Sequence, residues 1–496
     1  RRPSAIMSLA AKDALSKGDP PHDAYNLTYI IFFTLGVGTL FSWNAFISAA
    51  NYFGERLCHS RFDAYMNDFS ICYTAANVVS LALMIKYGAF IPRKLKIVGS
   101  FVFYTFIFIF ITVCVLLPDL SADFVYFSTA IACILSGGAT AGMSGGIFGM
   151  VGQFPGIYIQ AVMSGQGLSG LAVALVGMLA SLASATTPAG CGDDDDGGDG
   201  DDDTCSTYDK VDWGSFAYFV VAVIIFLTCV VGYLALEQLP LAHYYDQELS
   251  KRNQGDLQRP SQSQAAVNGG DEEANVNPAV ESLLPNGGDS VNDDVDHVDG
   301  RLRDAAALSP PGSGSSGEPA EMSALFAKIR SEAIGVWLTF AVTLSVFPSI
   351  TALIEPEDGC APFSKTLYVP FMFVMFNLFD LIGRTAAGYI QIIPDSRILT
   401  AAVCRLVWIP LFALCNVSGS RLDVLFGNRF WPSLFMAFMA LSNGYVSTLC
   451  MIYAPRRVQP QDAETAGTIM IFMLTSGLFS GSLLSYLVLL VVTGKA

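Results

Sequence analysis

The sequence predicts an all-α protein that crosses a membrane eleven times. The chain is 52% hydrophobic, has a mean hydropathy of +0.48 and carries only 14% charged residues, too few to cover the surface of a soluble protein of 496 residues. Eleven runs reach the ~20 apolar residues that a membrane helix needs, and they are too long to be barrel strands. The acids behind the formal net charge of −16 gather in two loops rather than over a whole surface.

The eleven expected spans follow one another along the chain, and one long polar segment separates the first six from the last five. They lie at 27–50, 69–90, 97–117, 122–147, 157–183, 213–235, 333–354, 366–391, 398–416, 430–452 and 466–493.

The polar segment and the loops divide the chain into parts. Residues 1–26 are expected to be a cytosolic tail, and 27–236 a six-helix bundle whose acidic loop, 189–210, faces outward. Residues 237–330 are rich in Gly, Ser, Pro, Asn and acids, so we expect a disordered cytosolic linker. Residues 331–496 are expected to form a five-helix bundle.

Basic residues set the expected orientation. "PRKLK" at 92–96, Arg397 and "PRR" at 455–457 all fall in loops that are internal if the N-terminus is internal. We therefore expect a cytosolic N-terminus and an extracellular C-terminus in a multi-pass protein of the plasma membrane. The acidic loop then faces outward, where Cys191 and Cys205 could close it as a disulfide, although two free cysteines fit the sequence equally well.

One span holds opposite charges four residues apart. Asp380 and Arg384 lie in the apolar run "FNLFDLIGR", share a helix face and can pair there, with Asn377 on the same stripe. Each charge costs about 2.5–3.5 kcal/mol near the middle of a span, so such residues are functional more often than structural. A carboxylate that accepts and a guanidinium that donates suit a neutral, hydroxyl-rich solute. The alternative is an ion pair that only locks helices together.

Other polar or helix-breaking residues also lie within the spans. Trp43 lies inside the first span rather than at an interface, beside Asn44, so the two residues either line a cavity or pack in the core. Gln166 is expected to make an interhelical hydrogen bond. Pro348 should kink the seventh span. Arg405 should reach the inner surface or brace an inner gate.

The sequence gives no support for an enzyme. All four histidines lie in tails or loops, so a metal site of the HExxH kind within the membrane is not expected. Only Asp380 lies deep in a span, whereas an intramembrane aspartyl protease needs two such residues, and no phosphate-binding loop is recognisable. We therefore expect no catalytic residues, no metal, no cofactor and no nucleic-acid partner.

Six stretches of the chain together resemble the equilibrative nucleoside transporter family. They occur in the expected order and cover nearly all of the hydrophobic sequence. They are "GTLFSWNAFISAANYF", "GGIFGMVGQFPGIYIQAVMSGQGLSG", "VTLSVFPSI", "FNLFDLIGR", "SNGYVSTLCMIYAPRRV" and "AETAGTIMIFMLTSGLFSG".

The resemblance implies a fold related to the major facilitator superfamily, and a solute site between its two halves. Asp380 and Arg384 look like the family's ribose-binding pair, and Trp43 like its solute-packing tryptophan. The other residues that the resemblance places at the site are Phe347, Phe373, Asn377, Thr74, Asn77, Ile47 and Ser144. Ser144 stands where many members have a base-contacting glutamine, and Ser42 where many have proline, so the preference among bases stays open.

The expected function is transport of nucleosides, and possibly nucleobases, through a lipid bilayer by alternating access. The arginine partner favours a permanently charged Asp380, which favours facilitated diffusion over proton coupling. The alternatives are a proton-coupled nucleoside or nucleobase symporter and a receptor that senses nucleosides without moving them.

Overall fold

The chain is described by a computed structural model that covers residues 20–48, 50–57, 65–117, 120–185, 213–257, 318–355 and 367–494. These residues are almost entirely helical, and their only extended pairings are two isolated bridges, Ile354 with Val417 and Cys415 with Phe426. The prediction of an all-α protein is therefore confirmed over the described residues.

Eleven segments among these residues are long and apolar enough to cross a membrane, which confirms the number predicted. The helices that hold them are α2 (Leu27–Ser48), α4 (Tyr65–Tyr87), α5 (Ser100–Val115, entered through a turn at Leu95–Gly99), α6 (Ala122–Val151), α7 (Gly156–Ala185), α8 (Trp213–Leu236), α10 (Glu318–Val346), α12 (Tyr368–Tyr389), α13 with α14 (Ile398–Cys404 and Trp408–Ala413), α15 (Phe430–Arg456) and α16 (Ala463–Thr493). Two further helices are α3 (Ala50–Leu57) and α9 (Pro240–Leu257).

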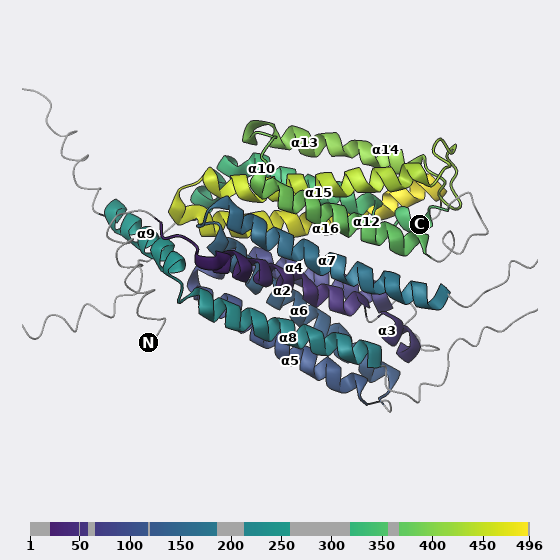
Figure 1. Cartoon of the computed structure of the whole chain (residues 1–496), viewed down its shortest axis with the longest axis horizontal. Helices are drawn as coiled ribbons and strands as arrows, with labels where there is room; N and C mark the ends of the chain where they lie inside the picture. The colour runs from purple at the N-terminus through teal and green to yellow at the C-terminus, as the bar shows by residue number, and fades with distance from the viewer. Residues whose placement is uncertain are drawn as a thin grey trace, which may run out of the picture. The chain divides into compact units, whose positions relative to one another are not determined.

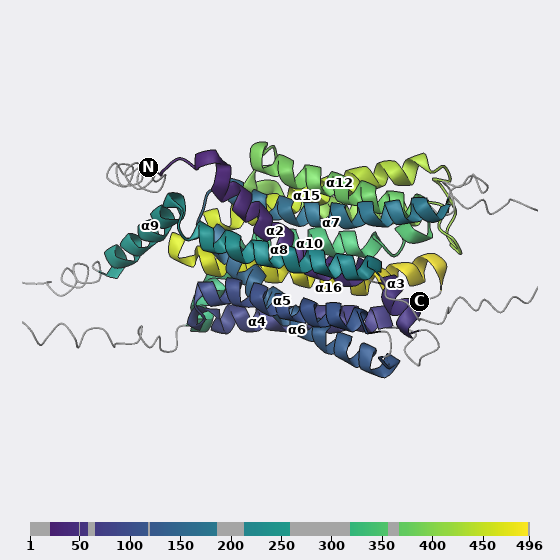
Figure 2. The same cartoon turned by 60° about the horizontal axis from the view of Figure 1, so that its bottom comes forward.

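The packing of these helices brings together spans that are far apart in sequence (Figures 1 and 2). Helix α2 packs on α7 and α8, α4 on α6, and α5 on α8, while α12 packs on α15. Spans from before and after the polar segment also meet, because α7 packs on α12, and α6 and α4 pack on α16. In Figure 1, α13 and α14 run along the top and α5 and α8 along the bottom.

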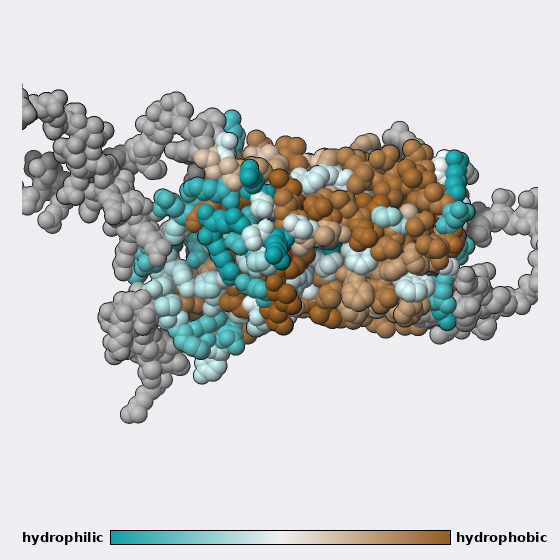
Figure 3. Space-filling view, turned by 90° about the horizontal axis from the view of Figure 1, so that it is seen from above, coloured by the Kyte–Doolittle hydropathy of each residue, from teal (hydrophilic) through white to brown (hydrophobic). Residues whose placement is uncertain are grey.

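The outer face of the helices is apolar. Figure 3 shows a wide hydrophobic band, with hydrophilic residues at both ends. Large apolar side chains such as Phe106, Ile224, Val231 and Leu179 are each more than half exposed. Such a band is favourable only against lipid, so this face agrees with a multi-pass membrane protein.

Both ends of the segment predicted to be disordered are helical, which corrects that prediction in part. Helix α9 covers Pro240–Leu257, and α10 begins at Glu318 rather than at the first apolar residue of its span. Each helix has a proline in its first turn and is then rich in Glu, Leu, Ala, Lys and Gln, which favour helices. Residues 258–317 lie outside the described residues.

Two spans are interrupted. The seventh is broken beside Pro348, where a kink was predicted: α10 ends at Val346, and a turn carries the chain past Pro348 into a short helix at Thr351–Leu353. The ninth is split at Arg405–Val407. The acidic loop at 189–210 with Cys191 and Cys205, and all but the last residues of the tail at 1–26, lie outside the described residues.

Candidate functional site

Asp380 and Arg384 form the predicted ion pair near the middle of α12. The Arg384 Nε and the Asp380 Oδ2 are 2.6 Å apart, and each side chain is only 6% exposed. One helical turn separates the two residues, so the helix itself brings them together. Because both are buried, neither charge points into lipid, and both depend on neighbouring helices for further partners.

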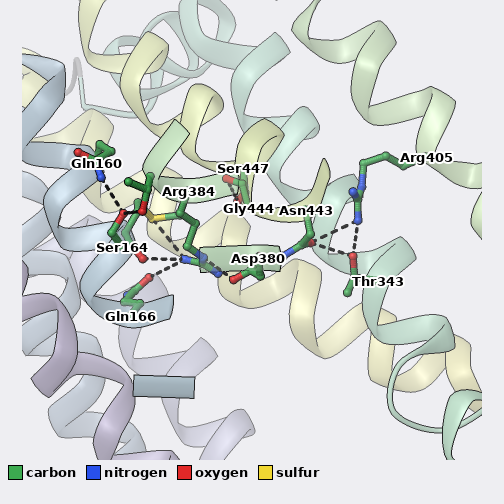
Figure 4. Close-up of polar contacts among 12 residues, drawn as sticks. Gln160, Ser164, Gln166, Thr343, Asp380, Arg384, Arg405, Asn443, Gly444 and Ser447 are labelled. Atoms are coloured by element: carbon green, nitrogen blue, oxygen red, sulfur yellow. Dashed lines mark hydrogen bonds and ion pairs between the residues drawn. The ribbon is translucent and has the colours of Figure 1, made fainter. Parts of the chain in front are cut away.

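Those partners come from helices on both sides of α12. From α7, the Met163 carbonyl and the Gln166 Oε1 accept hydrogen bonds from the Arg384 Nη1, at 3.3 and 3.4 Å. From α15, Asn443 donates from its Nδ2 to the Asp380 Oδ1 at 2.8 Å. Figure 4 shows these polar side chains in one row across the three helices. The pair therefore lies where a span of the first six meets spans of the last five.

The close approach of α12 and α15 depends on a glycine. A Cβ atom added at Gly444 would lie 2.0 Å from the Asp380 carbonyl oxygen, well inside van der Waals contact. The absence of a side chain at this position lets Asn443, the preceding residue, reach the Asp380 carboxylate.

Asn377 lies one turn before Asp380 but does not bond to the ion pair. Its Nδ2 donates to the Phe373 carbonyl of its own helix at 2.8 Å. Its Oδ1 faces α7, where a Cβ atom at Gly170 would lie 2.2 Å away. The predicted polar stripe therefore exists, but in this structure only Asp380 and Arg384 are bonded to each other.

The aromatic residues predicted to hold a ring form two separate groups. Trp43 stacks on Tyr73 of α4, with ring centroids 4.5 Å apart and an interplanar angle of 20°. Phe347 stacks on Phe376 at 4.2 Å and contacts Phe373 at 4.8 Å. No ring contact joins the two groups within the described part of the chain.

The residues predicted on α4 and α6 are buried to different degrees. Asn77 and Ser144 are buried and Thr74 is half-buried. The Asn77 Oδ1 is shielded from solvent and accepts no hydrogen bond from any described residue. An unsatisfied buried acceptor is unfavourable, so this oxygen is suited to a donor on a bound solute. Ile47 lies in α2, but its side chain is outside the described residues.

Gln166 joins helices, as predicted, and Asn44 does so as well. Gln166 donates to the Thr39 Oγ1 at 3.1 Å, so it links α2 to Arg384. Asn44 donates to the Ser169 Oγ of α7 at 3.0 Å.

Arg405 does not reach the inner surface, contrary to one prediction. Its side chain is buried among the last five spans, and the Arg405 Nη2 donates to the Thr343 Oγ1 at 2.5 Å and to the Asn443 Oδ1 at 3.4 Å. Arg405 begins the 3₁₀ turn between α13 and α14, and these acceptors take the place of water around its guanidinium.

An ion cluster at the start of α16 was not predicted. Glu464 accepts from Lys96 at 2.9 Å and from Arg93 at 3.1 Å, across more than 360 residues of sequence. The Arg93 Nη2 also donates to the Gln153 Oε1. The sequence signal was two acids, Asp462 and Glu464, at the start of an apolar span, on the side of the basic residues already assigned to an inner loop. Tyr73, Phe376 and Asn443 were missed as well. The two rings look like ordinary packing residues, and Asn443, although polar and inside an apolar span, has no partner that the sequence indicates.

Comparisons with known proteins identify the family of the chain. A family model described as "Nucleoside transporter" matches residues 128–192 and 203–490. Equilibrative nucleoside transporter 2 of Homo sapiens is 31% identical over 95% of this chain and 99% of its own. Equilibrative nucleoside transporter 1 of Rattus norvegicus is 30% identical over 94% of this chain and 98% of its own.

A solved major facilitator superfamily transporter, FucP in its outward conformation, covers 93% of this chain and 96% of its own, at 10% identity and a TM-score of 0.49. A likeness at this score decides nothing about the fold, so the major-facilitator-like arrangement and the division into six and five spans stay predictions. The family model and the relatives match along nearly the whole length, and the chain therefore belongs to the nucleoside transporter family.

Proposed function

We propose that this chain carries nucleosides across a membrane by facilitated diffusion, with Asp380 and Arg384 as the residues that hold the sugar. Membership of the family supports the substrate class. The observation that carries the assignment of the site is the buried ion pair, which lies near the middle of α12 and joins it to α7 and α15.

The chemistry of the pair fits a sugar with free hydroxyl groups. A carboxylate can accept about four hydrogen bonds, and the Asp380 carboxylate uses two of these positions, for Arg384 and Asn443. The remaining lone pairs can accept from sugar hydroxyls, while the guanidinium donates to hydroxyl oxygens. Because the pair is neutral as a whole, an uncharged solute meets no net charge from it.

The aromatic groups supply surfaces for the base. In our proposal Trp43, backed by Tyr73, packs on one side of the base, and Phe347 with Phe373 packs on the other. The free acceptor of Asn77 and the hydroxyl of Ser144 would then contact the edge of the base.

Alternating access requires that the first six and last five spans separate at one side and then at the other. The cluster of Glu464 with Arg93 and Lys96 ties the two groups together at the end where α16 begins. Opening that end would break these ion pairs, so the cluster serves as a closure that releases the solute only when it opens.

The side that bears this cluster is proposed to be cytosolic. Arg93, Lys94 and Lys96 lie beside one another there, in keeping with the positive-inside rule. The N-terminus would then be cytosolic and the C-terminus extracellular, in the plasma membrane. We expect no catalytic step and no coupling to protons, and uptake measured across an imposed pH gradient tests the latter.

The test is uptake of labelled adenosine by proteoliposomes that contain the full chain. Asp380→Asn and Arg384→Ala are each expected to abolish uptake while protein is still incorporated. Normal uptake in either variant would refute the assignment of the site. Counterflow of adenosine separates a carrier from a non-transporting receptor, and a panel of nucleosides and nucleobases defines the substrate class.

A further inference from the structure

The carboxylate of Asp380 is held through both of its oxygens, from two different helices. Arg384 donates to the Oδ2 from one turn further along α12, and Asn443 donates to the Oδ1 from α15 at 2.8 Å. Asn443 is itself only 1% exposed. The carboxylate therefore cannot rotate without breaking one of the two hydrogen bonds.

The other end of the Asn443 amide fixes its orientation. The Oδ1 lies 2.8 Å from the Thr343 Oγ1 and 3.4 Å from the Arg405 Nη2 (Figure 4). A guanidinium can only donate, and an ionised carboxylate can only accept. A flipped amide would set its NH₂ group against Arg405 and its oxygen against Asp380, so only one orientation satisfies both neighbours.

Arg405 is anchored independently of the ion pair. Its Nη1 donates to the Met439 carbonyl at 3.0 Å and also contacts the Ser442 hydroxyl, both on α15. Its charge therefore stands behind the amide and polarises the N–H bond that points at Asp380. The row of side chains ends at Arg405 (Figure 4).

We propose that Asn443, oriented by Arg405, is a positioning residue that holds the Asp380 carboxylate in the direction required by the hydroxyl groups of the solute. The inference rests on the proposed function and adds two residues to it. If Asn443 acts in this way, its loss should weaken binding of hydroxyl-bearing nucleosides in particular, whereas a merely structural residue should affect all substrates alike.

The experiment compares adenosine with 2′,3′-dideoxyadenosine, which lacks the 2′ and 3′ hydroxyls of the ribose and keeps the 5′ hydroxyl. The full chain is reconstituted in proteoliposomes, and the KM of adenosine uptake and the inhibition constant of the dideoxy compound are measured. For Asn443→Leu we expect the KM of adenosine to rise while the inhibition constant of the dideoxy compound changes little. The ratio of the inhibition constant to the KM should therefore fall about tenfold, the effect of weakening one hydrogen bond to a charged group. Arg405→Leu should give a fall of the same kind, and Arg405→Lys, which keeps the charge, should recover much of the ratio.

Two further variants keep the test decisive. Asn443→Ser is smaller and serves if the leucine variant does not incorporate. Thr475→Val removes a buried hydroxyl that bonds only within α16, and it should leave the ratio unchanged. An unchanged ratio in the Asn443 and Arg405 variants would overturn the positioning role, even if their KM values rise. Absence of adenosine uptake by the unmodified chain would instead overturn the proposed function, and this inference with it.

Discussion

Glu464→Gln is expected to shift the transporter toward the state that is open at the cytosolic end. In the structure Glu464 accepts hydrogen bonds from Lys96 and Arg93, and these ion pairs link α16 to the loop before α5. Glutamine has nearly the same shape but no charge, so the substitution removes the attraction while it leaves the packing in place.

The size of the shift follows from the burial of the three side chains. The Lys96 side chain is 7% exposed, while those of Arg93 and Glu464 are 26% and 28% exposed. Fully exposed ion pairs contribute about 0.2–1 kcal/mol, and hydrogen bonds to buried charged groups about 1.5–3 kcal/mol. Each of the two partly buried contacts should contribute a free energy between these values. Together they should contribute roughly 1–3 kcal/mol, which corresponds to a shift of about 5–150-fold in the equilibrium between the two states.

The shift can be measured as the reactivity of a cysteine in the interface that must open. Ile452 of α15 is buried and packs against Gly156 at the start of α7, where a span of the last five meets one of the first six. In Ile452→Cys, the rate of labelling by a membrane-impermeant thiol reagent added from the cytosolic side should rise at least about fivefold when Glu464→Gln is introduced. The chain with its native Ile452 gives the background from the other cysteines.

The control removes an ion pair that lies at the same end of the molecule but does not link the two groups of spans. Glu237 pairs with Lys94 at 2.8 Å, and both belong to the first part of the chain. Glu237→Gln should leave the labelling rate unchanged. If Glu464→Gln labels no faster than the unmodified chain, or if Glu237→Gln speeds labelling equally, the cluster is not a closure.

Two other predictions concern packing at the site. Tyr73→Leu removes the ring behind Trp43 and should raise the KM for adenosine up to about tenfold, since an aromatic pair contributes about 0.5–1.5 kcal/mol. Tyr73→Phe keeps the stack, so its KM should stay close to that of the unmodified chain. Equal KM values for the two variants would contradict the role of the stack. Gly444→Ala would place a Cβ atom 2.0 Å from the Asp380 carbonyl, so α12 and α15 must separate and we expect most uptake to be lost. Gly177→Ala, where the Cβ atom would meet no atom within 4 Å, should transport normally, and similar uptake by the two alanine variants would show that the close approach is unimportant.

The ion pair illustrates how far the sequence alone could lead to the site. Two opposite charges four residues apart in an apolar run must share a helix face, so the pairing of Asp380 with Arg384 follows from helix geometry. The contact of Asn443 with Asp380 crosses 63 residues and depends on which face α15 turns toward α12. Nothing local in "ALSNGYVS" distinguishes that asparagine from one that faces lipid or another helix.

The number and length of the spans were determined by the sequence itself, because in lipid each backbone polar group must be satisfied within its own helix and each helix must be long enough to cross. Which polar side chains meet was decided only by the tertiary structure. Lys96 and Glu464 lie 368 residues apart, and Trp43 finds Tyr73 rather than another ring, because the choice depends on how helices rotate and approach one another. In a membrane that choice is made by close packing and hydrogen bonds between helices, and these are properties of the assembled helices that no single span carries.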